Sequence, residues 1–294
     1  YNKEYGPEKE YNTSAVYEGV SGIPVSWFPM TAMRHDGWID FTLYFYYSHA
    51  VYYANTFVYS PEKQTVDFRI GTSGFFKTFL NDEPVLETEE EFNNDLDTYV
   101  AKTTLQKGWN RLLVKCGNSE IDRCNFLARF TDDKGHPLTG LQFSAETKAY
   151  TSRPGVTSVP KPNLDEEFFK AEIKAHPDYL ENYLLLADCF LRNDKGIEAE
   201  KTLKQALKQA PDAVILLDHM LEAYIRGRKY DEITTTLEKL ASMKADIPSA
   251  LEYQISEHMS NEEYDKAEEL LDRLERFIPG TERMYTYRIS LFSA

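Results

Sequence analysis

Two cysteines in the first half of the chain could form a disulfide. Cys116 ends one run of alternating apolar residues and Cys124 begins the next, across the loop 117–123. Alternation places both side chains on the apolar faces of their strands. Buried free thiols are the alternative, and three cysteines in the whole chain are too few for a fold built on disulfides. A bridge would indicate an oxidising compartment, because disulfides persist there.

Charged residues recur at helical spacing in the second half. Asp188 and Arg192 are four residues apart, and so are the successive members of the set Asp218, Glu222 and Arg226. Residues four apart share one face of a helix. Leu184, Leu191 and Ile225 are expected to lie exposed beside these charges, as parts of a binding surface. Ordinary solvated ion pairs, worth about 0.2–0.5 kcal/mol each, explain the same pattern.

Aromatic residues are concentrated between Trp38 and Tyr59. On a strand, Phe41, Leu43 and Phe45 would face one way while Tyr44 and Tyr46 face the other. Tyr44 and Tyr46 are therefore a candidate platform for a glycan. The alternative is that these rings pack in a core.

Motifs for catalysis and metal binding are missing from the sequence. The six histidines show none of the short spacings that hold a metal, and neither a Gly-x-Ser-x-Gly turn nor a phosphate-binding loop occurs. We expect no enzymatic activity, no cofactor and no metal.

Composition limits the partners. The net charge is −15, and no cluster of Lys and Arg provides the basic surface that nucleic acids require. No run approaches the roughly 20 apolar residues of a membrane span. A chain of 294 residues exceeds the usual size of one core, so we expect two domains, an α+β arrangement of β-sandwich and helices.

The second half repeats itself every 34 residues. Five columns keep this register: Ala199, Ile233 and Ala267; Leu203, Leu237 and Leu271; Gly196, Tyr230 and Tyr264; Ala206, Leu240 and Leu274; Pro211, Ala245 and Pro279. Small residues at 187, 199 and 206 permit close packing of antiparallel helices, and the prolines end every second helix. The pattern predicts helices near 180–192, 197–209, 214–227, 231–243, 248–260 and 264–277.

This repeat resembles the tetratricopeptide repeat family, whose period is about 34 residues. The signature positions in the first full repeat are Leu186, Ala187, Phe190, Ala199, Leu203, Ala206 and Pro211. The resemblance implies full repeats at about 180–213, 214–247 and 248–281, with half repeats at both ends of 164–294. It also places the charged stripes in the concave groove of a helical solenoid, and so implies a protein or peptide segment as the partner. The apolar helix Arg283 to Phe292 leads us to expect that further repeats follow.

The first half alternates with period two. Val66, Phe68 and Ile70 form one such run, and Leu112, Val114 and Cys116 another. Many short strands separated by turn clusters predict an antiparallel β-sandwich of the jelly-roll kind over 1–146.

The stretch 105–115, with Phe126 to Phe130 and Phe76 to Asn81, resembles bacterial galactose-binding-like modules over about 37–143. That family favours Asn-Gly at the turn where this chain has Asn81-Asp82. Such modules bind sugars or brace a neighbouring domain.

A proline-bearing segment, 147–163, is expected to be an extended linker. We expect a non-catalytic interaction scaffold from a larger bacterial protein, in the periplasm or at the cell surface. The alternative function is a carbohydrate-binding module that targets an enzyme elsewhere in the parent chain.

Overall fold

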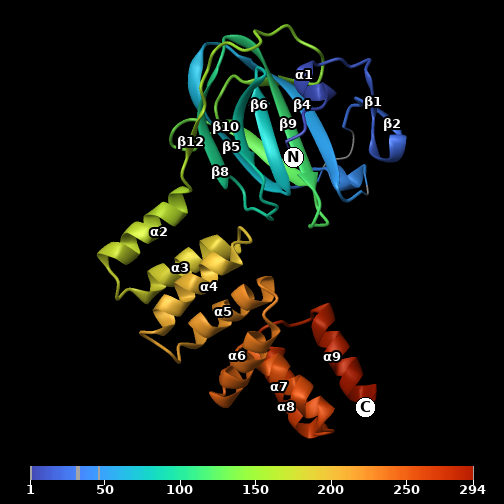
Figure 1. Ribbon diagram of the computed structural model, residues 1–294. Helices are drawn as coiled ribbons and strands as arrows, with labels where there is room; N and C mark the ends of the chain where they lie inside the picture. The colour runs from blue at the N-terminus through green and yellow to red at the C-terminus, as the bar shows by residue number, and fades with distance from the viewer. Residues whose placement is uncertain (1, 31–33, 46, 294) are drawn as a thin grey trace. The chain divides into compact units, whose positions relative to one another are not determined.

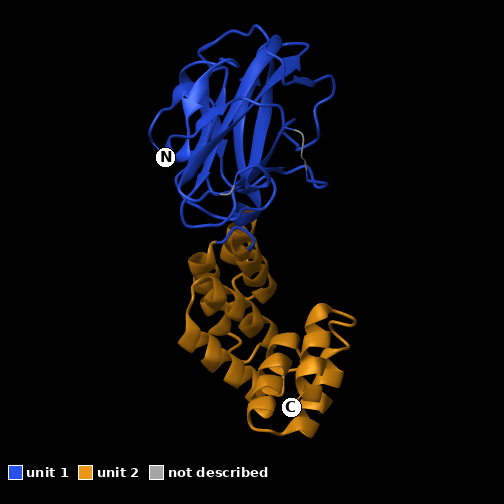
Figure 2. Ribbon diagram, turned by 90° about the vertical axis from the view of Figure 1, so that its right-hand side faces the viewer, with its two compact units in different colours: residues 1–167, 192–194 blue, residues 168–191, 195–294 orange. Residues whose placement is uncertain are grey.

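The computed structural model describes residues 2–30, 34–45 and 47–293. It contains two compact units, which Figure 2 draws in blue and orange. The first comprises 1–167 with 192–194, and the second 168–191 with 195–294. Antiparallel sheets come first and helices follow, as the change from period two to the 34-residue repeat predicts.

The first unit holds two five-stranded antiparallel sheets and a small ribbon (Figure 1). One sheet has the order β12-β8-β5-β10-β3, with bounds Val159–Lys161, Tyr99–Leu105, Gln64–Ser73, Asn125–Thr131 and Ile39–Asp40. The other has the order β11-β4-β9-β6-β7, with bounds Gln142–Ser144, Ala50–Ser60, Gly108–Asn118, Phe75–Leu80 and Glu83–Thr88. Strands β1 (Val16–Glu18) and β2 (Pro24–Ser26) form the ribbon, and helix α1 (Gly6–Lys9) precedes it.

The inner faces of the two sheets share one core. Phe68 and Ile70 of β5 and Phe130 of β10 meet Val114 and Cys116 of β9 in a single buried cluster. These are the residues that period-two alternation assigns to the apolar side, so that assignment is confirmed. Burying aromatic and branched side chains from both sheets is what holds the sheets together.

Asn81 and Asp82 form the two-residue turn between β6 and β7. Both have positive φ, at 52° and 67°, the backbone of the hairpin turn in which Asn-Gly is favoured. Asp82 tolerates this conformation where glycine is usual. Its carboxylate accepts hydrogen bonds from Arg111 at 2.7 Å, Tyr150 at 2.8 Å and Ser152 at 2.7 Å.

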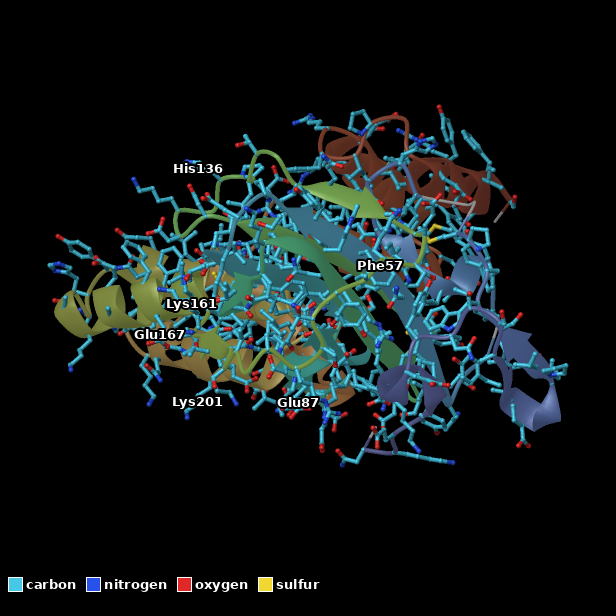
Figure 3. The ribbon with its side chains drawn as sticks, turned by 90° about the horizontal axis from the view of Figure 1, so that it is seen from above. Phe57, Glu87, His136, Lys161, Glu167 and Lys201 are labelled. Atoms are coloured by element: carbon cyan, nitrogen blue, oxygen red, sulfur yellow. The ribbon has the colours of Figure 1, made fainter. Side chains whose placement is uncertain are left out.

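The segment 147–163 is packed into the first unit, in contrast to the linker that its prolines suggest. Its last part is strand β12, which pairs with β8. Lys161, labelled in Figure 3, donates to the buried Asp67 at 2.5 Å. The backbone is extended, as prolines require. Polar groups of the segment bond to strand residues; for example, the N–H groups of Gly155 and Val156 donate to the Glu83 carboxylate of β7. Contacts therefore place the boundary between units after residue 167.

Helices follow one another from α2 onward (Figure 1). Their bounds are Leu164–Ala175 (α2), Leu180–Leu191 (α3), Gly196–Leu207 (α4), Val214–Arg226 (α5), Tyr230–Ser242 (α6), Pro248–Ser260 (α7), Tyr264–Leu274 (α8) and Glu282–Ser293 (α9). Helices α3, α5, α7 and α9 begin 34 residues apart, as do α4, α6 and α8. The predicted helices are confirmed, with ends that differ by a few residues.

Small side chains lie where the helices approach one another. Ala187, Ala199, Ala206 and Ala267 are fully buried. A larger side chain at these positions would separate neighbouring helices, because their axes already lie close together.

The turns inside the helical hairpins also repeat. Asp194, Arg228 and Glu262, which are 34 residues apart, have φ of 56°, 53° and 60°. In each turn the next residue's N–H donates to a carbonyl five residues earlier, for example Lys229 N to Tyr224 O at 2.9 Å. Each residue stands at the helix end where glycine is common.

None of the described helices is long and apolar enough to cross a membrane.

Candidate functional site

The charged stripe on the first helices of the hairpins partly connects those helices to one another. Asp218 on α5 accepts a hydrogen bond from Ser249 on α7 at 2.6 Å. One period later, Glu252 on α7 pairs with Arg283 on α9. Asp188 on α3 lies 3.2 Å from His219 on α5. Asp188 and Asp218 are therefore engaged within the stack itself.

Other stripe residues face solvent. Glu222 and Arg226 form an i,i+4 ion pair at 2.9 Å, and Ile225 beside them is 59% exposed. Leu184 on α3 is partly buried against the helical core. The exposed surface of α5 thus combines the acid Glu222, the base Arg226 and two branched apolar side chains, Ile215 and Ile225.

Two members of the predicted groove lie elsewhere. Leu191 was expected to be exposed, but it is 2% exposed and belongs to the core of α3 to α5. It stands at the end of α3, where the chain turns and its side chain packs inward. Arg192 follows the helix and is grouped with the first unit by its contacts.

The aromatic platform has a different backbone from the one expected. Phe41–Leu43 is a 3-10 turn rather than a strand, so side chains there do not alternate between two faces. Tyr44 packs against Phe28 and Phe45, with ring centroids 5.4 and 6.5 Å apart. Tyr46 lies outside the described residues.

Cys116 and Cys124 are free thiols in the core between the sheets. Burial raises the pKa of the Cys116 thiol, and the neighbouring Cys124 raises it further. A buried thiol of raised pKa is mostly protonated at neutral pH and reacts slowly. Cys189 is likewise free and buried, on α3.

A hollow of about 350 Å³ lies on the first unit. Its lining combines three arginines, one aspartate, one tryptophan and four uncharged polar residues: Arg34, Trp38, Ser73, Asn93, Asn94, Asp95, Arg123, Asn125 and Arg192. Arg34 pairs with Asp36 at 2.6 Å. Within the described ranges, no group of three His, Cys, Asp or Glu side chains is placed to hold a metal ion.

Two residues that line this hollow, Asn94 and Asn125, each have an amide oxygen that is unpaired within the described residues. The Oδ1 atoms of Asn94 and Asn125 are buried and find no hydrogen-bond donor in the described part of the chain. Both residues are more than nine-tenths buried. A buried unpaired acceptor costs about 1–3 kcal/mol. Trp38 adds an aromatic surface to the same lining.

A scan of protein-family models and a search of curated proteins found no match for this chain.

The outer face of β4 and β9 carries two buried cations. Arg111 and Lys115 alternate with the core residues of β9, so they point away from the core, yet each side chain is 1% exposed. Arg111 pairs with Asp82 and donates to Asn55 at 2.8 Å. We call Tyr53, Asn55, Phe57, Arg111 and Lys115 the Arg111–Lys115 face; Figure 3 labels Phe57, which is fully buried.

The sequence contained a signal for this face that the motif search missed. Leu113 stands between Arg111 and Lys115 in the outward-facing series of β9. An apolar side chain among outward charges indicates that something covers the sheet there. The hollow had no such signal, because its residues come from separate segments between 34 and 192 that only the fold brings together.

Proposed function

We propose that this chain is a non-catalytic protein-interaction scaffold, in which a tetratricopeptide-type stack follows a galactose-binding-like jelly-roll module. The observation that carries the proposal is the constant 34-residue spacing of helix starts and of the left-handed residues Asp194, Arg228 and Glu262. Repeated hairpins of this kind stack into an extended surface that suits a protein or peptide segment.

The proposed contact surface is centred on α5. Ile225 provides an apolar contact, and the Glu222–Arg226 pair provides charges of both signs beside it. Leu184 extends the surface to α3. Asp188 and Asp218 support it by connecting neighbouring helices, so their removal would act through the shape of the stack.

A pair of single substitutions tests the surface. Ile225→Ser removes the apolar contact, and Ile197→Ser is its control, because Ile197 is 76% exposed on α4, a second helix of its hairpin. Both variants of the 294-residue chain are used to capture partners from extracts of the source cell, with quantitative mass spectrometry. We expect Ile225→Ser to lose a defined set of proteins that Ile197→Ser retains. Equal recovery by wild type and both variants would reject the surface.

A second candidate function is saccharide binding in the hollow of the first unit. The polar lining of the hollow favours a hydroxyl-rich ligand, and sugars supply hydroxyl donors together with a face that packs on Trp38. A glycan array probed with the full chain, followed by calorimetry, tests this. Asn125→Ala is expected to abolish binding, while Tyr44→Ala leaves it unchanged. Loss with Tyr44→Ala alone would favour the aromatic platform instead.

A further inference from the structure

Residues 2–11, here called the N-terminal segment, cover the Arg111–Lys115 face. The Lys115 Nζ donates to the carbonyl oxygen of Lys3 at 2.8 Å, and the Arg111 Nη2 donates to that of Pro7 at 2.8 Å. Figure 1 draws α1, within this segment, beside β4 and β9. Both cations thus bind main-chain carbonyl oxygens of the segment. These hydrogen bonds fix the position of its backbone and do not depend on its side chains.

One carboxylate adds side-chain recognition. Glu8 Oε1 accepts from Lys115 at 2.9 Å and from the Tyr53 hydroxyl at 2.5 Å. Burial raises the pKa of Tyr53, and the hydrogen bond to Glu8 raises it further, so the phenol remains a donor at physiological pH. A neutral side chain at position 8 would leave Lys115 buried beside a weaker acceptor.

Two tyrosines flank that carboxylate at a spacing of three. Tyr5 packs edge-on against Tyr53, with centroids 6.5 Å apart. Tyr11 packs on Phe57 at 5.4 Å, and the Arg111 guanidinium lies 5.4 Å from the Tyr11 ring. The face therefore matches the pattern Tyr-x-x-Glu-x-x-Tyr in a chain that makes one helical turn.

The polar character of the contact makes release of the segment feasible. An apolar cover over apolar strands would be at least as stable, since buried ion pairs seldom add net stability. When the segment leaves, Lys115 and Arg111 regain water, and Arg111 keeps Asp82 at 2.7 Å. The charged groups of an uncovered face of this kind are hydrated, whereas a wholly apolar bare sheet would aggregate.

We propose that the Arg111–Lys115 face is a peptide-binding site for Tyr-x-x-Glu-x-x-Tyr segments, filled in cis by residues 5–11, and that the same segment of a second copy of the chain can take its place. This site is independent of the surface proposed on α5. Its ligand is a tyrosine-bearing peptide whose central glutamate pairs with Lys115.

A labelled synthetic peptide of residues 2–12 tests the proposal against the full chain. Wild type should bind it weakly, because the tethered segment competes at high effective concentration. A Tyr5→Ala/Glu8→Gln chain should bind it at least about tenfold more tightly, since its own segment competes poorly. A Glu8→Gln peptide should lose that binding. A Glu10→Gln peptide should retain it, because Glu10 is exposed. The two peptides are matched controls, since each substitution removes one negative charge.

A second measurement on the wild-type chain covers the case in which the variant chain fails to fold. Hydrogen exchange of the Glu8 and Glu10 amides, which bond to Tyr5 and Gly6 carbonyls, should be much faster than that of amides in β9. Protection equal to β9 would show a permanent cover and overturn the proposal. So would a folded Tyr5→Ala/Glu8→Gln chain that binds no peptide.

Discussion

The Asp218 carboxylate accepts a hydrogen bond from the Ser249 hydroxyl at 2.6 Å, 31 residues further along the chain. Glu252 and Arg283 occupy the equivalent positions one 34-residue period later and also pair. Asp218, which the sequence pattern assigns to partner binding, therefore connects successive hairpins, as Glu252 does one period later. Two consequences for stability follow from this repeated contact.

Removing the first of these contacts should destabilise the helical unit. A hydrogen bond to a charged group is worth about 1.5–3 kcal/mol when buried, and Asp218 is only partly buried, so Asp218→Ala should cost about 1 kcal/mol. Glu222→Ala, which removes an exposed i,i+4 pair on the same helix, should cost about 0.3–0.5 kcal/mol. Urea unfolding of the full chain followed by helical circular dichroism measures both. Equal effects would show that the contact between helices contributes nothing specific.

The second contact should give an unusual pH dependence. Burial raises the pKa of Glu252 from its ordinary 4.5, and Arg283 offsets only part of that effect. A carboxyl group whose pKa is raised in the folded state stabilises the fold below about pH 4.5. This stabilisation is lost as the pH rises through the pKa of the folded state. Glutamine does not titrate, so Glu252→Gln lacks this pH-dependent loss. The free energy of unfolding of Glu252→Gln minus that of wild type should therefore increase from pH 4 to pH 7.

A carboxylate of opposite behaviour provides the control. Hydrogen bonds from Lys266 and His258 lower the pKa of Glu263, so its contribution is present above about pH 4.5 and lost as pH falls. Glu263→Gln should therefore lose stability relative to wild type over the same rise in pH. Thermal melts at several pH values measure both slopes, and slopes of the same sign would contradict the assignment.

The helical unit was predictable because its determinants are local and repeated. Alanines at 187, 199 and 206 and prolines at 177 and 211 set the register directly. The left-handed turn residues Asp194, Arg228 and Glu262 could not be foreseen, since none is the glycine that such a position favours. Their conformation follows from the hairpin geometry, which overrides the local preference.

The candidate sites were less predictable because they depend on contacts between distant segments. Alternation correctly assigned Cys116 to the core, but it does not reveal that Arg111 is covered by Pro7, 104 residues away. The predicted exposure of Leu191 was wrong because a helix end packs inward where the chain turns. The interstrand partner of a residue is a property of topology, which periodicity leaves open.

The state of the cysteines can be counted directly. We expect no reaction of the native chain with an alkylating reagent, because burial raises the pKa of Cys116 and encloses all three thiols. After unfolding without reductant, three thiols per chain should react, as measured by intact mass. Only one reactive thiol after unfolding would demonstrate a bridge between Cys116 and Cys124.

At Asp82, in the turn between β6 and β7, the preferred backbone conformation and the ion pair with Arg111 favour different residues. Asp82→Gly relieves a left-handed conformation that costs an ordinary residue about 1–2 kcal/mol. It also leaves the Arg111 guanidinium, 1% exposed, without its counter-charge, at a cost of about 3–5 kcal/mol. We therefore expect the variant to be less stable by about 1–4 kcal/mol in urea unfolding.

A matched glycine substitution isolates the backbone effect. Arg228 has φ of 53° and is exposed, so Arg228→Gly should be neutral or stabilising by up to about 1 kcal/mol. The double variant Asp82→Gly/Arg111→Met should recover part of the loss of Asp82→Gly, because the unpaired cation is removed as well. An Asp82→Gly chain as stable as wild type would show that turn preference outweighs the ion pair, and that Arg111 finds sufficient partners in Asn55 and the N-terminal segment.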